Sequence, residues 1–353
     1  MSRAQGRSSR FPGASAFSSS SHPGTSGFGG FSSTQAGSGL SYLTEPLDFS
    51  SISDANVGVA FKNLLKKDAT TKTKALEELV AYVRAHPHEQ HGGPEEAILE
   101  AWVQVYPRIS IDNARRAREL SHTLQFELMK SARKRMEKRV PKVVGTWLAG
   151  TTDKDRAVAN AASQGLSSLL TNIDKVLAFW KKCQHQILTY SAEAIRETKD
   201  TLSDERSTTA DDAEAKYFRV VNSSLSLVLE LLQKLEQADL DAEADSYDIF
   251  FSEDVVWKSA TFADSAVRKV TCELLWTCLE KRHDSVASQV SRLKKIFVTE
   301  GLKSNQTGSA VEYVRVLTRL TQKFPEVWSS SSDKKTPISR LQIFLEKGSQ
   351  ATT

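Results

Sequence analysis

The chain has 353 residues, of which 39% are hydrophobic and 25% are charged, as in a water-soluble globular protein that at this length has several domains or an array of repeats. Its 47 basic and 43 acidic residues leave a formal charge of +4, so any basic surface has to come from local clustering. The three cysteines form no CxxC pair and no apolar stretch approaches the roughly 18 residues of a membrane span, which argues against disulfides, a structural zinc site and a transmembrane protein, and we expect a cytoplasmic one.

The first 44 residues contain no acidic residue and are dominated by serine and glycine. Such a segment cannot bury enough apolar surface to offset the chain entropy lost on folding, so we expect a disordered tail over residues 1–50. Arg3, Arg7 and Arg10 also fit a mitochondrial transit peptide, which we disfavour because glycine and proline interrupt any amphipathic helix. The remainder, residues 51–353, is predicted to form one helical domain.

From residue 54 onward the apolar residues recur at helical spacing. Val57, Phe61 and Leu64 share one helix face, and Asp54 is placed to cap that helix. Pro94 is placed to open a later helix, at a position where its missing N–H is not needed. Further helices are predicted around residues 76–83, 117–128, 141–150, 153–170, 173–190, 213–236, 253–260, 264–281, 284–298, 308–324 and 337–346. No segment alternates convincingly with period two, so we predict an all-α fold.

Three of the helix starts resemble one another, at Asp112, Asp155 and Asp264. Each has an acidic residue followed by small or β-branched residues and arginine, ahead of an apolar face. The first two lie about 43 residues apart, within the period of about 40–47 residues of HEAT and armadillo repeats. Because two short helices cannot bury their apolar faces alone, neighbouring pairs must stack. We therefore predict a HEAT- or armadillo-like helical-repeat solenoid.

Three segments, at residues 61–79, 106–118 and 145–150, match one family in order and spacing. The first contains a run of lysines and threonines, and the second reads Ser-Ile-Asp-Asn-Ala-Arg-Arg from Ser110. These two are the most specific, because ordinary HEAT repeats do not share them. Together the segments resemble the amino-terminal domain of Listerin-type ubiquitin ligases.

The resemblance implies a large RING-type E3 ubiquitin ligase of ribosome-associated quality control, which acts on nascent chains stalled on the large ribosomal subunit. In that family the amino-terminal domain engages the large subunit together with a nascent-chain-sensing partner, while a carboxy-terminal RING holds zinc and binds the ubiquitin-conjugating enzyme. Nothing in this sequence resembles the Cys and His pairs of a RING. We therefore expect this chain to be a docking scaffold without catalytic residues or a cofactor, with the ligase chemistry in a part outside it.

The densest basic run lies at the end of the helix predicted at 117–128, opposed nearby only by Glu137. Arg135, Lys138 and Arg139 share a helix face and could meet RNA phosphates through salt-sensitive contacts. The alternative is a solvated face whose cations favour the negative end of the helix dipole. The candidate binding residues of this run are Arg133, Lys134, Arg135, Lys138 and Arg139.

A second set of candidates comes from the segments that carry the resemblance. Lys66 and Lys67 belong to a turn between helices, where side chains and backbone amides can face outward. Around Arg115 and Arg116, at least one arginine is expected to pair with an acid of an adjacent repeat, a structural role that competes with binding. The candidates for contact with the ribosome or the partner are Lys66, Lys67, Asp68, Lys72, Lys74, Arg108, Asn113, Arg115 and Arg116.

Other residues of types that bind metals or catalyse reactions are better explained by a structural role. His86, His88 and His91 cluster in a loop, but their spacing has little specificity for a metal ion. No phosphate-binding glycine loop, GxSxG or HExxH motif is present. Four tryptophans on apolar faces are predicted to pack in the core: Trp102, Trp147, Trp180 and Trp276. The alternative function is a generic HEAT-repeat adaptor or transport-receptor fragment that binds protein partners.

Overall fold

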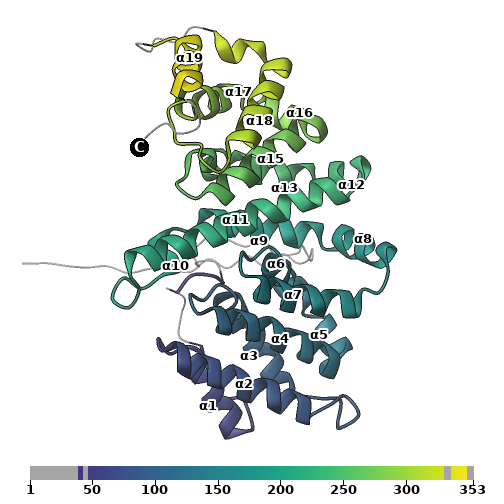
Figure 1. Cartoon of the computed structure of the whole chain (residues 1–353). Coiled ribbons are helices and arrows are strands. Elements are labelled where there is room, and N and C mark those ends of the chain that lie inside the picture. Colours follow the sequence, from purple (N-terminus) through teal and green to yellow (C-terminus); the bar gives the residue numbers. More distant parts are fainter. Residues whose placement is uncertain (1–38, 43–46, 330–334, 348–353) are drawn as a thin grey trace, which may run out of the picture. The chain divides into compact units, whose positions relative to one another are not determined.

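The computed structural model describes residues 39–42, 47–329 and 335–347, which form helices and loops without any β-strand (Figure 1). The predicted all-α class is therefore confirmed. The disorder predicted for residues 1–38 lies outside this described part of the chain. Across the same described residues, no helix combines the length and the apolarity that a membrane crossing requires.

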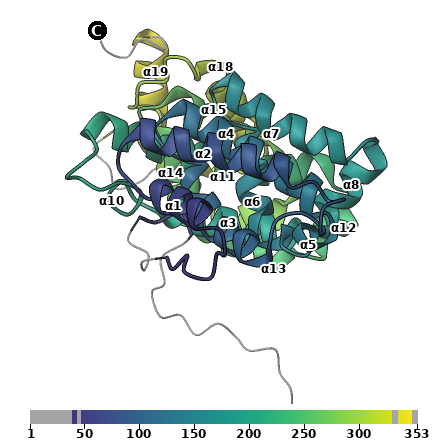
Figure 2. The same cartoon turned by 90° about the horizontal axis from the view of Figure 1, so that it is seen from below.

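The helices form pairs, and equivalent members of successive pairs stack into two layers (Figures 1 and 2). This arrangement is the predicted helical-repeat solenoid, in which each pair buries its apolar faces against its neighbours. The first layer contains α1 (Ala55–Leu64), α3 (Glu96–Ile109), α6 (Val140–Gly150), α9 (Gln184–Arg196), α13 (Ala244–Ser252), the π-helix η2 (Lys294–Glu300) and α19 (Pro337–Lys347). The second contains α2 (Ala69–Ala85), α4 (Arg115–Ala132), α7 (Arg156–Leu169), α11 (Ala210–Lys234), α15 (Ser265–Lys281) and α18 (Ala310–Lys323).

The regular stacking of the second layer changes after α7. That helix packs on α4 and α6, whereas α11 packs on α6, α9 and α15.

Two of the predicted helices are divided in the structure. The helix predicted over residues 173–190 is two helices, α8 (Ile173–Lys182) and α9, which are divided at Cys183, and the helix predicted over residues 284–298 is also divided. The short helices are α5 (Lys134–Glu137), α8 (Ile173–Lys182), α10 (Lys199–Leu202), α12 (Gln237–Asp241), α14 (Asp254–Lys258), η1 (Ser259–Thr261), α16 (His283–Ala287), α17 (Val290–Leu293) and η3 (Pro325–Trp328).

Aspartates begin several of the helices, where their carboxylates accept hydrogen bonds from backbone N–H groups of the first turn. These caps are Asp54, Asp68, Asp155 and Asp264. The start predicted at Asp112 differs, because α4 begins at Arg115 after Ala114. One carboxylate oxygen of Asp112 instead accepts the N–H of Ala114 at 2.8 Å, and the other binds Lys72 at 2.5 Å.

Two hydrophobic cores meet at α6, which contributes a different face to each. Val143 and Trp147 pack in a first core made by residues 49–162. Val144 and Leu148 pack in a second core, which continues through the later helices. The first three helix pairs and the later ones therefore have two interiors that share buried residues of α6, and Met129 and Leu166 pack against both.

The predicted packing role of the tryptophans is confirmed for Trp102, Trp147 and Trp180, which are 0%, 1% and 6% exposed. Trp276 differs, since it is only partly buried in α15. One side of Trp276 packs against the second core, and the guanidinium of Arg315 lies 4.2 Å from its ring centroid, so this tryptophan combines partial packing with a surface cation–π contact.

Residues 39–42 lie against the helices as a short strap. Leu40 is 2% exposed, and the backbone N–H of Tyr42 donates to the carbonyl of Thr201 at 3.0 Å. Phe49 is also buried, at 3% exposure. These described positions of the segment predicted as a tail therefore pack on the helical domain: the pocket of Leu40 is built by residues distant in the sequence, and Phe49 packs against Phe61 of α1.

α3 and α4 share a buried polar network. The Tyr106 hydroxyl lies 2.8 Å from Nδ1 of His122, and the indole N–H of Trp102 donates to Oε1 of Gln125 at 2.8 Å. A Cβ at Gly150 of α6 would lie 2.2 Å from the His122 ring, so this ring is covered by the α6 backbone. Burial lowers the pKa of His122 to about 4, which keeps the imidazole neutral at pH 7.

This buried imidazole makes stability depend on pH. In the unfolded chain a histidine binds its proton near pH 6.5, whereas folded His122 does so only near pH 4. Its contribution is fully present above pH 6.5 and is lost as the pH falls towards 4, by about 3 kcal/mol in total. Urea unfolding between pH 7 and 4 should therefore show a shallower pH dependence in His122→Gln. Equal slopes for the two proteins would contradict the assignment.

Candidate binding surface

The two predicted sets of basic residues lie at opposite ends of the helices. We call the end that holds the turns α1–α2 and α3–α4 the first edge, and the end that holds the loop α2–α3 and helix α5 the second edge. α4 connects them, and its 18 residues span about 27 Å at the rise of an α-helix. The structure therefore does not bring Arg115 and Arg133 into one site, and each edge has its own chemistry.

Arginines of the second edge hold the loop between α2 and α3 in place. Arg133 pairs with Glu89 at 2.8 Å. Arg135 donates to the carbonyls of Gly92 and Pro94, the latter at 2.6 Å. Arg135 is therefore held by the loop backbone, whereas the Arg133–Glu89 pair is exposed on both sides, at 55% and 69%.

The rest of the basic run on the second edge is divided between pairing and exposure. Arg139 lies 2.5 Å from Glu96 and 2.7 Å from Glu100 and is largely buried. Lys134 and Lys138 are exposed and form no ion pair with a residue that the structure describes. Only these two lysines of the run are available to a partner without breaking a contact of the fold.

A ladder of ion pairs runs along the first edge from repeat to repeat. Lys72 pairs with Asp112 at 2.5 Å, and Arg118 pairs with Asp153 at 2.8 Å, with all four side chains largely buried. Arg118 also donates to the carbonyl of Asp112 at 2.9 Å. The predicted pairing of an arginine with an acid of the adjacent repeat is thus confirmed, and Lys72 has the same structural role.

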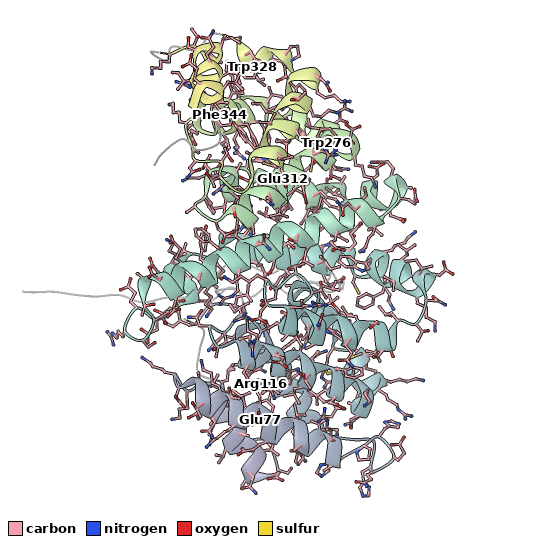
Figure 3. All side chains as sticks on the ribbon, viewed as in Figure 1. Glu77, Arg116, Trp276, Glu312, Trp328 and Phe344 are labelled. Atoms are coloured by element: carbon pink, nitrogen blue, oxygen red, sulfur yellow. The ribbon has the colours of Figure 1, made fainter. Side chains whose placement is uncertain are left out.

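Arg115 and Arg116 are bound more loosely on the outside of this ladder. The nearest atoms of Arg115 and Asp155 are 3.8 Å apart. Arg116 lies 3.4 Å from Glu77 on α2 and 2.9 Å from Glu119, and the first of these pairs is seen in Figure 3. Since exposed pairs of this kind contribute little, both guanidinium groups can exchange their partners for a ligand.

Lysines of the α1–α2 turn form the outermost part of the first edge. Lys67 pairs with Asp204 of the α10–α11 loop at 2.6 Å, so the turn contacts a segment much later in the sequence. Asp68 caps α2, and hydrogen bonds from Thr71 hold the pKa of its carboxyl below the usual value. Lys66 and Lys74 are exposed and have no acidic partner among the described residues.

Two further cations of this edge come from α11 and were not among the sequence candidates. Lys216 donates to the carbonyl of Leu202 at 2.7 Å, and burial lowers its pKa to about 8. Arg219 donates to Oδ1 of Asn113 at 3.1 Å, and burial, followed by the charge of Arg118, lowers its pKa to about 10. For Lys216 the sequence did contain an indication of burial, because this residue lies on the same helix face as the buried residues 220, 224 and 227.

Arg108 is the least compensated cation of the group. Its Nε is buried without a hydrogen-bond partner, and burial lowers the pKa of the guanidinium, with no carboxylate acting against that effect. Together with its neighbours it forms what we call the inner cation cluster: Lys72, Arg108, Arg118, Lys216 and Arg219. The acids that act most strongly on Lys216 and Arg219 are Asp112, Asp153 and Asp212.

The histidine loop offers no common coordination point. Nδ1 of His86 faces the Tyr82 carbonyl at 2.8 Å, and Nδ1 of His88 faces the Ser131 carbonyl at 3.2 Å. Each ring therefore fixes the loop to a different place. In the described part of the chain no three His, Cys, Asp or Glu side chains are grouped as a metal site requires.

The arrangement can bind anions. The two thiols of α15 are deeply buried, and burial raises the pKa of Cys272 to about 12 and also raises that of Cys278, so neither thiol is a thiolate at pH 7. The first edge combines exposed lysines with the inner cation cluster. The second edge carries two exposed lysines beside arginines already paired to glutamates.

Comparison with known proteins shows to which family this chain is similar. The model of the family "E3 ubiquitin-protein ligase listerin, N-terminal domain" matches residues 52–353. The chain belongs to the listerin family. The listerin of Neurospora crassa is 44% identical over 93% of this chain and 20% of its own length. The listerin of Gallus gallus is 25% identical over 91% of this chain and 18% of its own length. The listerin of Saccharomyces cerevisiae is 28% identical over 61% of this chain and 14% of its own length.

The chain therefore spans about a fifth or less of the length of these listerins. Among solved structures, a crystal structure of an engineered protein aligns with 76% of this chain and 98% of its own, at 16% identity and a TM-score of 0.30. That likeness is too distant to support a functional argument.

The listerin-like sequence segments meet at the first edge. Residues 61–79 cover the end of α1, the lysine turn and the start of α2, and residues 106–118 cover the turn from α3 into α4. The third segment, residues 145–150, lies in α6, where a Cβ at Gly145 would lie 2.3 Å from Tyr190 of α9. The first two segments thus supply the ladder and the exposed lysines, and the third supplies a close helix contact.

Proposed function

We propose that this listerin-family domain docks on the large ribosomal subunit through its first edge. The observation that carries the proposal is the exposed charge there: Lys66 and Lys74 have no acidic partner among the described residues, and they share this edge with the inner cation cluster, in which Arg108 also lacks one. Phosphates of ribosomal RNA are the densest anions on that subunit, and each phosphate contact releases counterions. Membership of the listerin family supports the same assignment.

The wider role follows from the family. We infer that the domain orients a much longer cytosolic protein, in which a zinc-binding RING recruits the ubiquitin-conjugating enzyme and modifies nascent chains stalled on the subunit. A nascent-chain-sensing quality-control partner would bind beside the domain and share the docking. On this proposal the chain contributes binding and orientation only, and its buried thiols and paired arginines take no part in ubiquitin transfer.

Co-sedimentation with isolated large ribosomal subunits tests the docking. The chain should pellet with the subunits at low salt and less at raised salt. Lys66→Glu/Lys74→Glu should bind more weakly, and the slope of log affinity against log salt should become shallower by about 2, one per lost phosphate contact.

The matched control reverses two equally exposed lysines of the second edge, Lys134→Glu/Lys138→Glu. It should retain most of the binding. If the two variants behave alike, the first edge is not the contact surface. If the unaltered chain never pellets, even with added quality-control partner, the docking itself is refuted.

A further inference from the structure

The strap at residues 39–42 occupies a groove built by helices from both halves of the domain. Leu40 packs in a small apolar cluster apart from the two main cores. Besides the Tyr42 N–H, the Ser41 hydroxyl donates to the Thr201 carbonyl, at 3.1 Å. One apolar anchor with main-chain hydrogen bonds is how extended peptides bind to grooves. We call this site the strap groove, and its walls are Pro107, Ile111, Ala194, Leu202 and Val220.

The rim of the strap groove belongs to the inner cation cluster. The Leu202 carbonyl, beside the Leu40 pocket, accepts the ammonium of Lys216 at 2.7 Å. The Ile111 carbonyl accepts Arg219 at 3.4 Å. Arg108 follows Pro107 directly at the upstream end of the groove, and its guanidinium has no acidic partner among the described residues. Cations therefore border the apolar pocket on several sides.

The strap satisfies only the apolar half of this site. Residues Gly39 to Tyr42 carry no charge, so this part of the strap offers no carboxylate to Arg108, Lys216 or Arg219. Room for more exists, because a Cβ at Gly39 would make ordinary van der Waals contact with Pro107 at 3.6 Å. A cavity of about 280 Å³ also adjoins Gly39 and Leu40, lined by Tyr190 and Glu193 among others. A bulkier segment would fit where the strap has glycine, provided that its carboxylates face Arg108 and not Glu193.

We propose that the strap groove is a docking site for an extended acidic segment of a partner protein, anchored by a leucine, and that the chain's own strap occupies the groove until that partner displaces it. The leucine enters the pocket of Leu40, and carboxylates beside it meet Arg108 and the rim. The inference goes beyond the proposed ribosome docking, which uses the same inner cation cluster, because it concerns a protein segment and a groove that is covered in the present state.

Synthetic peptides and fluorescence anisotropy test this directly. The acidic probe has the sequence of residues 37–42 with Ser38→Glu and Gly39→Glu, and the matched neutral probe has Gln at both positions. Both are titrated into the full chain and into Leu40→Ala, whose strap no longer competes. The acidic probe should bind Leu40→Ala about tenfold more tightly than the unaltered chain and about tenfold more tightly than the neutral probe, and Arg108→Gln in the same background should remove the second difference.

A second variant tests the proposal without depending on correct folding of Leu40→Ala. Tyr42→Pro removes the N–H that bonds Thr201 but leaves the Leu40 pocket intact, and it should also increase binding of the acidic probe. Equal affinity for the acidic and neutral probes would overturn the proposal, as would no binding to either strap variant. Displacement of the acidic probe by a short oligouridine at lower concentration than by unlabelled probe would assign the groove to RNA and overturn it as well.

Discussion

Arg118→Met is expected to destabilise the domain by about 3–5 kcal/mol, because it leaves the buried carboxylate of Asp153 without its hydrogen-bonded counter-charge, and Arg219 acts on that carboxylate only from beyond ion-pair distance. The two side chains are 5% and 8% exposed and their nearest atoms lie 2.8 Å apart. The substitution also removes the donor to the Asp112 carbonyl, which loosens the turn into α4. Urea denaturation, followed by circular dichroism, measures the loss as a lower midpoint.

The double variant Arg118→Met/Asp153→Leu is the control for this prediction. Replacing both charges by apolar groups removes the desolvation penalty as well as the attraction, so most of the lost stability should return. A double variant less stable than Arg118→Met alone would show that Asp153 does not suffer from the loss of its partner.

Trp147→Ala is expected to cost a similar amount, about 3–5 kcal/mol, by leaving a cavity in the first core. The indole is 1% exposed, and it fits against α7 because residue 165 is glycine, where a Cβ would lie 3.1 Å from the ring. Thermal and urea unfolding should both show the loss.

Trp276→Ala provides the matched comparison for Trp147. That ring is half-buried at the surface of α15, and its main specific contact is with the guanidinium groups of Arg315 and Arg319. Loss of an exposed cation–π contact costs about 0.5–1 kcal/mol, so the two tryptophan variants should differ several-fold in their effect. Equal losses would mean that burial does not decide the role of these rings.

Much of the fold could be predicted from the sequence, because helical periodicity and caps are local signals. The apolar spacing of Val57, Phe61 and Leu64 located α1, and aspartates at Asp155 and Asp264 marked true helix starts. Asp112 carried the same local signal, yet its carboxylate is drawn to Lys72 of the preceding repeat. Such long-range pairing is invisible to a pattern that compares neighbours along the chain.

The candidate surface was less accessible to prediction for the same reason. The sequence identified the basic residues but not their separation, which depends on the length of α4 between Arg115 and Ala132. It also could not tell the paired Arg139 from the exposed Lys138, since the glutamates that bind the arginine come from α3. Leu40, finally, lies in a segment whose composition is that of a tail, and only the folded groove explains its burial.

The sharing of α6 by two interiors has a consequence for how damage spreads through the protein. Repeat arrays lose structure in blocks, because each block depends mainly on its immediate neighbours. A lesion confined to the interior of residues 49–162 can therefore melt the helices that carry the lysine turn while the later helices keep their shape. Such a chain would keep a folded carboxy-terminal block beside an unfolded first core, and limited proteolysis should therefore remove the helices of residues 49–162 first.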